Sequence, residues 1–265
     1  MRRYMTNVMH NPKISIITVC FNSEAHLEET ILSVVNQSYS NKEYVIIDGG
    51  STDGTHAIID KYKDQIDYYV SESDRGISDA FNKGIRAVTG DVIGIVNSDD
   101  KLVDGALQVV ANHYSSEYEI YRGVCRIWDP TTGYTIDEIP TMEWPLLPIK
   151  MKVSHPSTFI TKFAYQKWGN YDVNLKYAMD FDLLQRMYKQ EAKAIRVDEP
   201  LAIFRLGGVS QQDEKARKKE LCSILRKNGA NSSQVLFFNL YYTLRLFVKH
   251  IVLRSKVVAI VSKKY

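Results

Sequence analysis

Short apolar runs alternate with amphipathic segments through about the first hundred residues, and this alternation limits the folds open to the chain. The runs are apolar throughout, whereas the segments between them repeat apolar residues at helical spacing. We therefore expect strands at 14–19, 44–48, 68–70 and 91–96, with helices at 23–37, 55–63 and 77–88. Strands that alternate with helices and are apolar on both faces predict a parallel α/β sheet covered by helices.

After about residue 115 this alternation ends. Segments 119–128 and 134–139 predict an antiparallel pair around a turn that contains Asp129 and Gly133. The remaining expected elements are a strand at 158–161, a helix at 181–190, a strand at 194–206 broken near Pro200, and helices at 211–226 and 234–253.

The composition fits one large α/β unit with a helical appendage. With 265 residues, 45% of them hydrophobic and 25% charged, the chain can bury a full core and is not disordered. We expect an N-terminal arm at 1–12, a main domain at 13–210 and a basic helical extension at 211–265. Cys20, Cys125 and Cys222 are too few and too scattered for a disulfide framework or a zinc site, so we expect reduced thiols.

Charge is unevenly distributed along the chain. No Asp or Glu follows Glu220, whereas eight Lys or Arg residues do. Because the rest of the chain is mildly acidic, we expect no nucleic-acid partner but a local anionic partner for the tail. The N-terminus has no apolar segment typical of a signal peptide.

The tail segment 235–253 is nineteen residues long, nearly enough to span a bilayer. Arg245, Lys249 and His250 within it oppose spanning. Its apolar residues form one helical stripe: Leu236, Leu240, Leu244, Phe247 and Ile251. We expect a helix lying in an anionic membrane interface. The alternative is a helical hairpin packed on the main domain or on a dimer partner.

Polar residues gather where three of the expected strands end. The first strand runs into 18–22, the second into 48–54 and the fourth into 97–100. Ligands of open α/β sheets bind beyond the carboxyl ends of the strands, so we expect one crevice there. A single cluster of this kind is also typical of turns and helix caps. Three in succession indicate a binding site.

The ordered motifs resemble the family-2 glycosyltransferases, which have the nucleotide-sugar-binding GT-A fold. Between Lys13 and Ser210, the matching pieces are ISIITVCFN, YVIIDGGSTDGT, SESDRGISDAFNKGI, GDVIGIVNSDD and AMDFDLLQRM. The resemblance is closest to bacterial members that build surface polysaccharides. It implies a Rossmann-like, mostly parallel sheet flanked by helices, with a C-terminal helical extension. Residues 13–115 would bind the nucleotide-sugar and residues 116–210 the acceptor.

The resemblance also implies roles for individual residues. Asp48 would accept a hydrogen bond from the base, since a carboxylate is an acceptor-only group. Asp53 would either cap the next helix or contact ribose. The implied nucleotide-sugar contacts are Thr18, Val19, Asn22, Asp48, Gly50, Asp53, Asp74, Arg75, Asp79, Asn82, Lys83, Asn97 and Ser98.

Two further carboxylates carry the implied chemistry. Asp99 would bind Mn²⁺ or Mg²⁺, hard cations that prefer oxygen ligands, with water-mediated support from Asp100. Asp180 matches the catalytic base, whereas Asp182, two residues on, is expected to be structural. Asn97 and Met179 stand where the family has acidic residues. The candidates for acceptor or diphosphate contacts are His155, Arg205 and Ser210.

The resemblance therefore implies an inverting, metal-dependent transferase that moves sugar from a UDP-sugar to a hydroxyl of a glycan or polyprenyl-diphosphate-linked acceptor. Such an acceptor would be met at the inner face of the cell membrane, so we expect a cytoplasmic protein peripherally associated there, with homodimerisation left open. The Gly-rich motifs of nicotinamide oxidoreductases and P-loop kinases are missing. A non-catalytic nucleotide-sugar or partner-binding module on the same fold remains the alternative.

Overall fold

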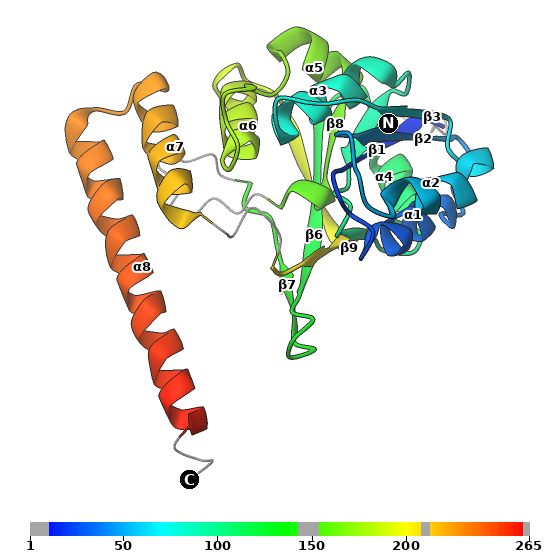
Figure 1. The fold of residues 1–265 in the computed structure, drawn as a ribbon. Coiled ribbons are helices and arrows are strands. Elements are labelled where there is room, and N and C mark those ends of the chain that lie inside the picture. Colours follow the sequence, from blue (N-terminus) through cyan, green and yellow to red (C-terminus); the bar gives the residue numbers. More distant parts are fainter. Residues whose placement is uncertain (1–10, 143–153, 208–212, 262–265) are drawn as a thin grey trace, which may run out of the picture.

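The computed structural model describes residues 11–142, 154–207 and 213–261 (Figure 1). The first half contains β1 (Ile14–Cys20), α1 (Leu27–Val35), β2 (Lys42–Asp48), α2 (Thr55–Lys61), a 3₁₀ turn (Lys63–Gln65), β3 (Tyr68–Ser71), α3 (Ile77–Ala87), β4 (Val92–Ile95), β5 (Lys101–Leu102) and α4 (Ala106–His113). The second half contains β6 (Ile120–Trp128), β7 (Thr135–Glu138), a 3₁₀ turn (His155–Ser157), β8 (Thr158–Thr161), α5 (Lys162–Trp168), α6 (Met179–Lys189), β9 (Ala194–Arg205), α7 (Glu214–Lys227) and α8 (Ser232–Val261).

The nine strands form one sheet in the order β3-β2-β1-β4-β8-β6-β9-β5, with β7 paired to β6. The first four strands in this order pair in parallel, which confirms the prediction for the first half. β8 runs antiparallel to both β4 and β6 and joins the two halves into one sheet. The predicted pair at 119–128 and 134–139 is also confirmed, as antiparallel β6 and β7.

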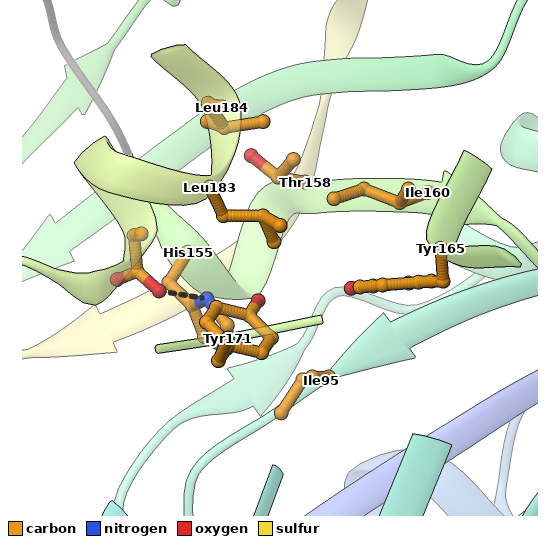
Figure 2. A pocket seen from close by; sticks show the side chains of 9 residues that line it. Ile95, His155, Thr158, Ile160, Tyr165, Tyr171, Leu183 and Leu184 are labelled. Atoms are coloured by element: carbon orange, nitrogen blue, oxygen red, sulfur yellow. Dashed lines mark ion pairs between the residues drawn. The ribbon is translucent and has the colours of Figure 1, made fainter. Parts of the chain in front are cut away.

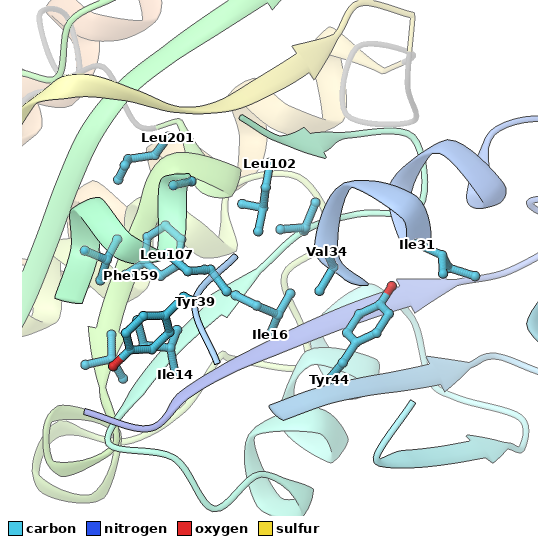
Figure 3. Packing of buried hydrophobic residues seen from close by; sticks show 14 of the residues in the cluster. Ile14, Ile16, Ile31, Val34, Tyr39, Tyr44, Leu102, Leu107, Phe159 and Leu201 are labelled. Atoms are coloured by element: carbon cyan, nitrogen blue, oxygen red, sulfur yellow. The ribbon is translucent and has the colours of Figure 1, made fainter. Parts of the chain in front are cut away.

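Two apolar layers cover the sheet because β1 is buried along its whole length and alternates its side chains between the faces. Ile14 and Ile16 pack with α1, α2 and α4 on one face (Figure 3). Ile17 and Val19 pack with α3, α5 and α6 on the other. The carboxyl ends of the parallel strands are left between these layers, where the predicted site lies.

Several elements differ from the predictions. α1 begins at Leu27 because the segment before it is tied to the β2 turn, where the Ser23 N–H donates to the Thr55 hydroxyl. β9 is continuous through Pro200, which lies at an irregularity in the pairing with β6, where its missing N–H is tolerated. The short helices α4 and α5 were not predicted, although Thr161 caps α5.

The tail forms two helices that pack on the main domain through α6. Leu221 and Leu225 of α7 share an apolar cluster with Phe238 of α8 and Phe181 of α6. Figure 1 shows α7 and α8 running side by side at the edge of the molecule next to α6, with α8 extending beyond α7. None of the helices in the described part of the chain is long and apolar enough to cross a membrane. The three cysteines are buried and free, as expected.

Candidate active site

Hydrogen bonds join the carboxyl ends of β1, β2 and β4. The Asn22 N–H donates to the Ser51 hydroxyl at 2.7 Å, and the Thr52 N–H donates to Asn22 Oδ1 at 2.9 Å. The hydroxyls of Ser23 and Ser98 lie 2.8 Å apart, which links the β1 end to the β4 end. The three polar clusters therefore converge, as the sequence predicted.

Asp48 organises the turn after β2. Its carboxylate has no exposed surface and accepts hydrogen bonds from the Ser51 N–H and from the hydroxyls of Ser51 and Ser71. Burial raises the pKa of Asp48, but these hydrogen bonds outweigh it and leave the pKa below its ordinary value. Hydrogen bonding of Asp48 to a base stays a prediction, because in this conformation its oxygens are occupied by the turn.

The glycines of this turn meet the expected requirements. Gly50 has φ +84°, which disfavours any residue with a side chain. A Cβ on Gly49 would lie 2.7 Å from Oδ2 of Asp74, so a larger residue would push the Asp74 carboxylate aside. Asp53 accepts hydrogen bonds from the N–H and hydroxyl of Thr55, in the first turn of α2. The N-cap residue of α2 is Gly54 and has no side-chain cap, so both roles of Asp53, helix cap and ribose contact, stay predictions.

Two predicted nucleotide contacts are corrected. Thr18 is fully buried and its hydroxyl accepts a hydrogen bond from Tyr44, within the core. Val19 is buried in the opposite layer. Both residues lie inside β1, where alternate side chains point into the two layers, so neither side chain is available to a ligand. The exposed residues that follow them, Phe21 and Asn22, stand at the crevice instead.

The segment before α3 is held by its own charged residues. Asp74 accepts a hydrogen bond from the Gly76 N–H, and Asp79 forms an ion pair with the exposed Arg75 at 3.1 Å. Lys83 pairs with Glu72 at 2.9 Å. Arg75 thus presents its guanidinium at the surface, as a diphosphate contact requires.

Asn82 is corrected to a packing residue. It is buried, and its side-chain amide makes reciprocal hydrogen bonds with the backbone of Tyr171. This pairing joins α3 to the segment before α6.

The turn after β4 leaves oxygen atoms without donors. Asn97 Oδ1 is buried and has no hydrogen-bond partner among the described residues. Burial raises the pKa of Asp99, and this effect outweighs the opposing influence of Arg205. Asp100 is fully buried and accepts hydrogen bonds from Arg205 N–H and Asn97, so the predicted water-mediated metal support is replaced by a structural role.

These donors fit a hard divalent cation, whose remaining ligands are supplied by diphosphate and water. Within the described ranges, no group of three or more His, Cys, Asp or Glu residues could hold an ion. Asn97 and Asp99 would therefore provide the protein's share of such a site.

His155 lies against Asp180 at the start of α6. Nδ1 of His155 is 2.9 Å from Oδ1 of Asp180, and Figure 2 marks this ion pair. The His155 ring stacks on Phe81, with 4.8 Å between centroids and 13° between planes. Its Nε2 has no hydrogen-bond partner in the described part of the chain. Phe81 therefore fixes the ring that faces the carboxylate.

A small cavity connects this pair to the end of β4. Ile95, His155, Tyr171 and Asp180 are among the residues that line it (Figure 2). Ile95 is the last residue of β4, and Asp99 follows four positions later, so Asp180 lies beside the strand that carries the metal candidates. Asp182 is fully buried and pairs with Arg186, which confirms its predicted structural role.

Arg205 belongs to a neighbouring cluster. Its guanidinium lies 4.5 Å from the centre of the Trp128 ring and 3.1 Å from Glu29. Its backbone ties β9 to Asp100, so Arg205 reaches the β4 turn, although its side chain is already occupied. Ser210 lies outside the described residues.

Sequence analysis missed three residues at the site. Phe21 has an exposed ring 3.4 Å from a Cβ built on Gly49. His26 has a buried Nδ1 without a partner among the described residues. Glu220 accepts hydrogen bonds from the N–H groups of residues 176–178, directly before Asp180. Of these three residues, only Phe21 could have been found from the sequence, as a lone aromatic directly after the first strand.

Known proteins are similar to this chain in sequence. The model of glycosyl transferase family 2 matches residues 15–170. An uncharacterized glycosyltransferase of Mycobacterium tuberculosis is 30% identical over 187 residues, covering 66% of this chain and 68% of its own. The GalNAc(5)-diNAcBac-PP-undecaprenol beta-1,3-glucosyltransferase of Campylobacter jejuni is 29% identical over 120 residues. That match covers 44% of this chain and only 39% of the Campylobacter protein.

Solved structures share the fold. S. aureus TarS 1–349 in complex with UDP-GlcNAc has a TM-score of 0.66 and 16% identity, over 89% of this chain and 73% of the other. The mannosyltransferase PcManGT of Pyrobaculum calidifontis, in complex with GDP-Man and Mn²⁺, has a TM-score of 0.63 and 16% identity, over 87% and 70%. The expected GT-A fold is thus confirmed, and with the match over more than half of its length the chain belongs to glycosyltransferase family 2.

Proposed function

We propose that this family-2 glycosyltransferase transfers a sugar from a UDP-sugar to an acceptor hydroxyl with inversion at the anomeric carbon. Asp180 takes the proton of the hydroxyl as its oxygen attacks the face of the sugar opposite the diphosphate. The bond to the new oxygen forms as the bond to the diphosphate breaks, so no enzyme nucleophile is needed. The carrying observation is that Asp180 shares a cavity with Ile95, at the strand end that leads to Asp99.

The joined strand ends supply the donor side of the site. The exposed ring of Phe21 beside the Gly49–Gly50 turn offers a stacking surface for a base. Arg75 offers an exposed charge to the diphosphate. TarS, with the same fold, has been solved in complex with UDP-GlcNAc, so UDP-sugars are the first donors to test.

Asn97 and Asp99 would hold Mn²⁺ or Mg²⁺. Such a cation neutralises the charge that develops on the departing nucleoside diphosphate. The protein's part is to present the buried Asn97 Oδ1, which has no hydrogen-bond partner among the described residues, together with the carboxylate of Asp99. PcManGT, solved in complex with GDP-Man and Mn²⁺, shares the fold.

The acceptor is proposed to be a glycan or polyprenyl-diphosphate-linked sugar of bacterial surface-polysaccharide synthesis. The Campylobacter relative is named for an undecaprenol-diphosphate-linked substrate. Such an acceptor lies at the inner face of the cell membrane, so the enzyme would work in the cytoplasm, peripherally associated with that face.

Asp180→Asn tests the proposed base. We expect the variant to bind donor like the wild type and to lose transfer by roughly 10²–10⁴-fold, the usual effect of removing a general base. UDP release with a panel of UDP-sugars measures transfer, and NMR gives the anomeric configuration of the product. Asp104→Asn, an exposed carboxylate after β5, is the matched control. An Asp180→Asn enzyme with wild-type turnover would refute the assignment.

Asp99→Ala tests the metal. We expect it to weaken Mn²⁺-dependent UDP binding in titration calorimetry and to abolish most turnover, because a single carboxylate supplies the charged ligand. Excess EDTA should have the same effect on the wild type. Full activity in EDTA would exclude metal dependence. Metal-dependent UDP-sugar binding without turnover by any donor would instead identify a non-catalytic module.

A further inference from the structure

α8 is apolar on two opposite faces. Val235, Phe238 and Tyr242 recur at helical spacing, are buried, and pack against α7. On the other side of the helix, six large apolar side chains are between 50% and 63% exposed: Leu236, Phe237, Leu240, Leu244, Phe247 and Val248. We call these six residues the outer stripe. The hairpin alternative is therefore right for one face of α8 and leaves the other uncovered.

The tail that carries the outer stripe is strongly basic. From residue 213 to the end, the sequence has twelve Lys or Arg residues against three Asp or Glu. Arg245 is exposed on α8, and Lys218 of α7 reaches α8, where its ammonium donates to the Thr243 hydroxyl at 2.8 Å. An uncovered apolar face with basic residues on its flanks is typical of helices that lie in an anionic lipid interface.

We propose that the outer stripe is the surface by which this protein docks on an anionic bilayer. The six side chains enter the boundary between head groups and acyl chains, while Arg245 and the basic residues of α7 contact lipid phosphates. The buried face of α8 stays packed against α7, so docking requires no unfolding.

A second copy of the chain is a poorer occupant of the outer stripe. Every charged residue after Glu220 is basic, so two stripes packed together would bring positive charge against positive charge. A phosphate-rich surface supplies the opposite sign together with an apolar layer.

The hairpin also connects this surface to the proposed base. Glu220 of α7 accepts hydrogen bonds from the N–H groups of residues 176–178, and Ala178 and Phe181 pack in the same cluster as α8. Docking would thus bring the α6 end of the active site toward the bilayer. This orientation rests on the proposed function, whereas lipid binding itself does not.

Co-sedimentation of the full-length protein with vesicles tests the proposal. We expect binding at low salt to phosphatidylcholine vesicles that contain one third phosphatidylglycerol, little binding to pure phosphatidylcholine, and release by high salt. Leu240→Glu should weaken binding at least about tenfold, since it removes an apolar side chain and adds a repelled charge. Ser223→Glu, which adds the same charge on an exposed position of α7 outside the outer stripe, is the matched control.

Leu240→Ser combined with Leu244→Ser separates the apolar contribution from charge and should also reduce binding. Circular dichroism and melting temperature establish that each variant is folded.

Failure of the wild type to bind anionic vesicles at low salt would overturn the proposal, as would equal loss of binding in Leu240→Glu and Ser223→Glu. A dimer in light scattering that Leu240→Glu dissociates, without any vesicle binding, would assign the stripe to self-association instead. Because the vesicle assay contains neither sugar donor nor acceptor, its result does not depend on whether the enzyme is active.

Discussion

Three aspartates at this site illustrate how surroundings assign different tasks to one type of side chain. Asp48 is fully buried, its oxygens are saturated by hydrogen bonds, and its pKa is lowered on balance. Burial is the largest influence on Asp99 and raises its pKa. Asp180 is partly exposed and faces an imidazole. The first suits a rigid turn, the second a cation, and the third proton transfer.

His155 is expected to position Asp180. Because its ring is stacked on Phe81 and lies 2.9 Å from the carboxylate, its loss should let Asp180 move from its productive position. We expect His155→Ala to lower kcat by about 10–10²-fold, the scale of a misplacement near 1 Å, and to leave KM for the donor unchanged. Steady-state kinetics measure this split.

His113→Ala, on α4 in the other layer of the protein, is the control for His155→Ala. A rise in donor KM with unchanged kcat in His155→Ala would instead support the predicted diphosphate contact.

At the scale of elements, the start of α6 is supported by a helix from the tail. Ala178, at the N-cap position of α6, makes no side-chain capping bond. Glu220 of α7 instead holds the segment just before the helix by accepting hydrogen bonds from the backbone N–H groups of residues 176–178. Since hydrogen bonds to a charged acceptor contribute about 1.5–3 kcal/mol, this contact is a main determinant of where Asp180 lies.

We expect Glu220→Ala to lower kcat by about tenfold and the free energy of unfolding by about 1–3 kcal/mol, because three donors lose their acceptor. Glu220→Gln, which keeps one acceptor oxygen, should recover part of both. Turnover and urea unfolding measure the two effects. Glu199→Ala, an exposed carboxylate on β9, provides the comparison. Wild-type kcat in Glu220→Ala would show that α7 does not position the base.

At the scale of the whole molecule, the tail is both a packing element and an exposed surface. The donor side of the site is built from residues before α4, and none of its hydrogen bonds involves α8. The α7–α8 cluster, in contrast, buries Phe238 almost completely. Donor binding and tail packing should therefore respond to different changes.

Truncation after Ala230 tests this separation. The shortened protein should remain soluble and bind UDP, whereas its melting temperature should fall, because each large side chain lost from the cluster contributes about 1.5–3 kcal/mol. Thermal melts with and without UDP and metal measure both properties. A truncated protein that melts at the wild-type temperature would mean that α8 adds no stability, and one that fails to bind UDP would place the tail in the donor site.

Much of the fold followed from periodicity in the sequence. The apolar runs at β1, β2 and β4 and the helical spacing of α3 are local signals, since burial of a strand on both faces requires apolar side chains throughout. The convergence of the strand ends also followed, because parallel strands end on one edge. Short helices such as α5 give too few turns for a periodic signal. Pro200 predicts a break in the strand, whereas the irregular pairing with β6 accommodates a proline there.

Tertiary structure alone decided which polar residues are available to a ligand. Thr18 and Asn82 carry polar groups of the kind that bind ligands, but both residues are buried. Their polar groups are hydrogen-bonded to Tyr44 and to the Tyr171 backbone, which lie 26 and 89 positions away. The contacts of Glu220 with residues 176–178 and the covering of one α8 face by α7 likewise depend on packing between distant segments. A sequence pattern specifies what a side chain can do, whereas its neighbours in space decide whether it is free to do it.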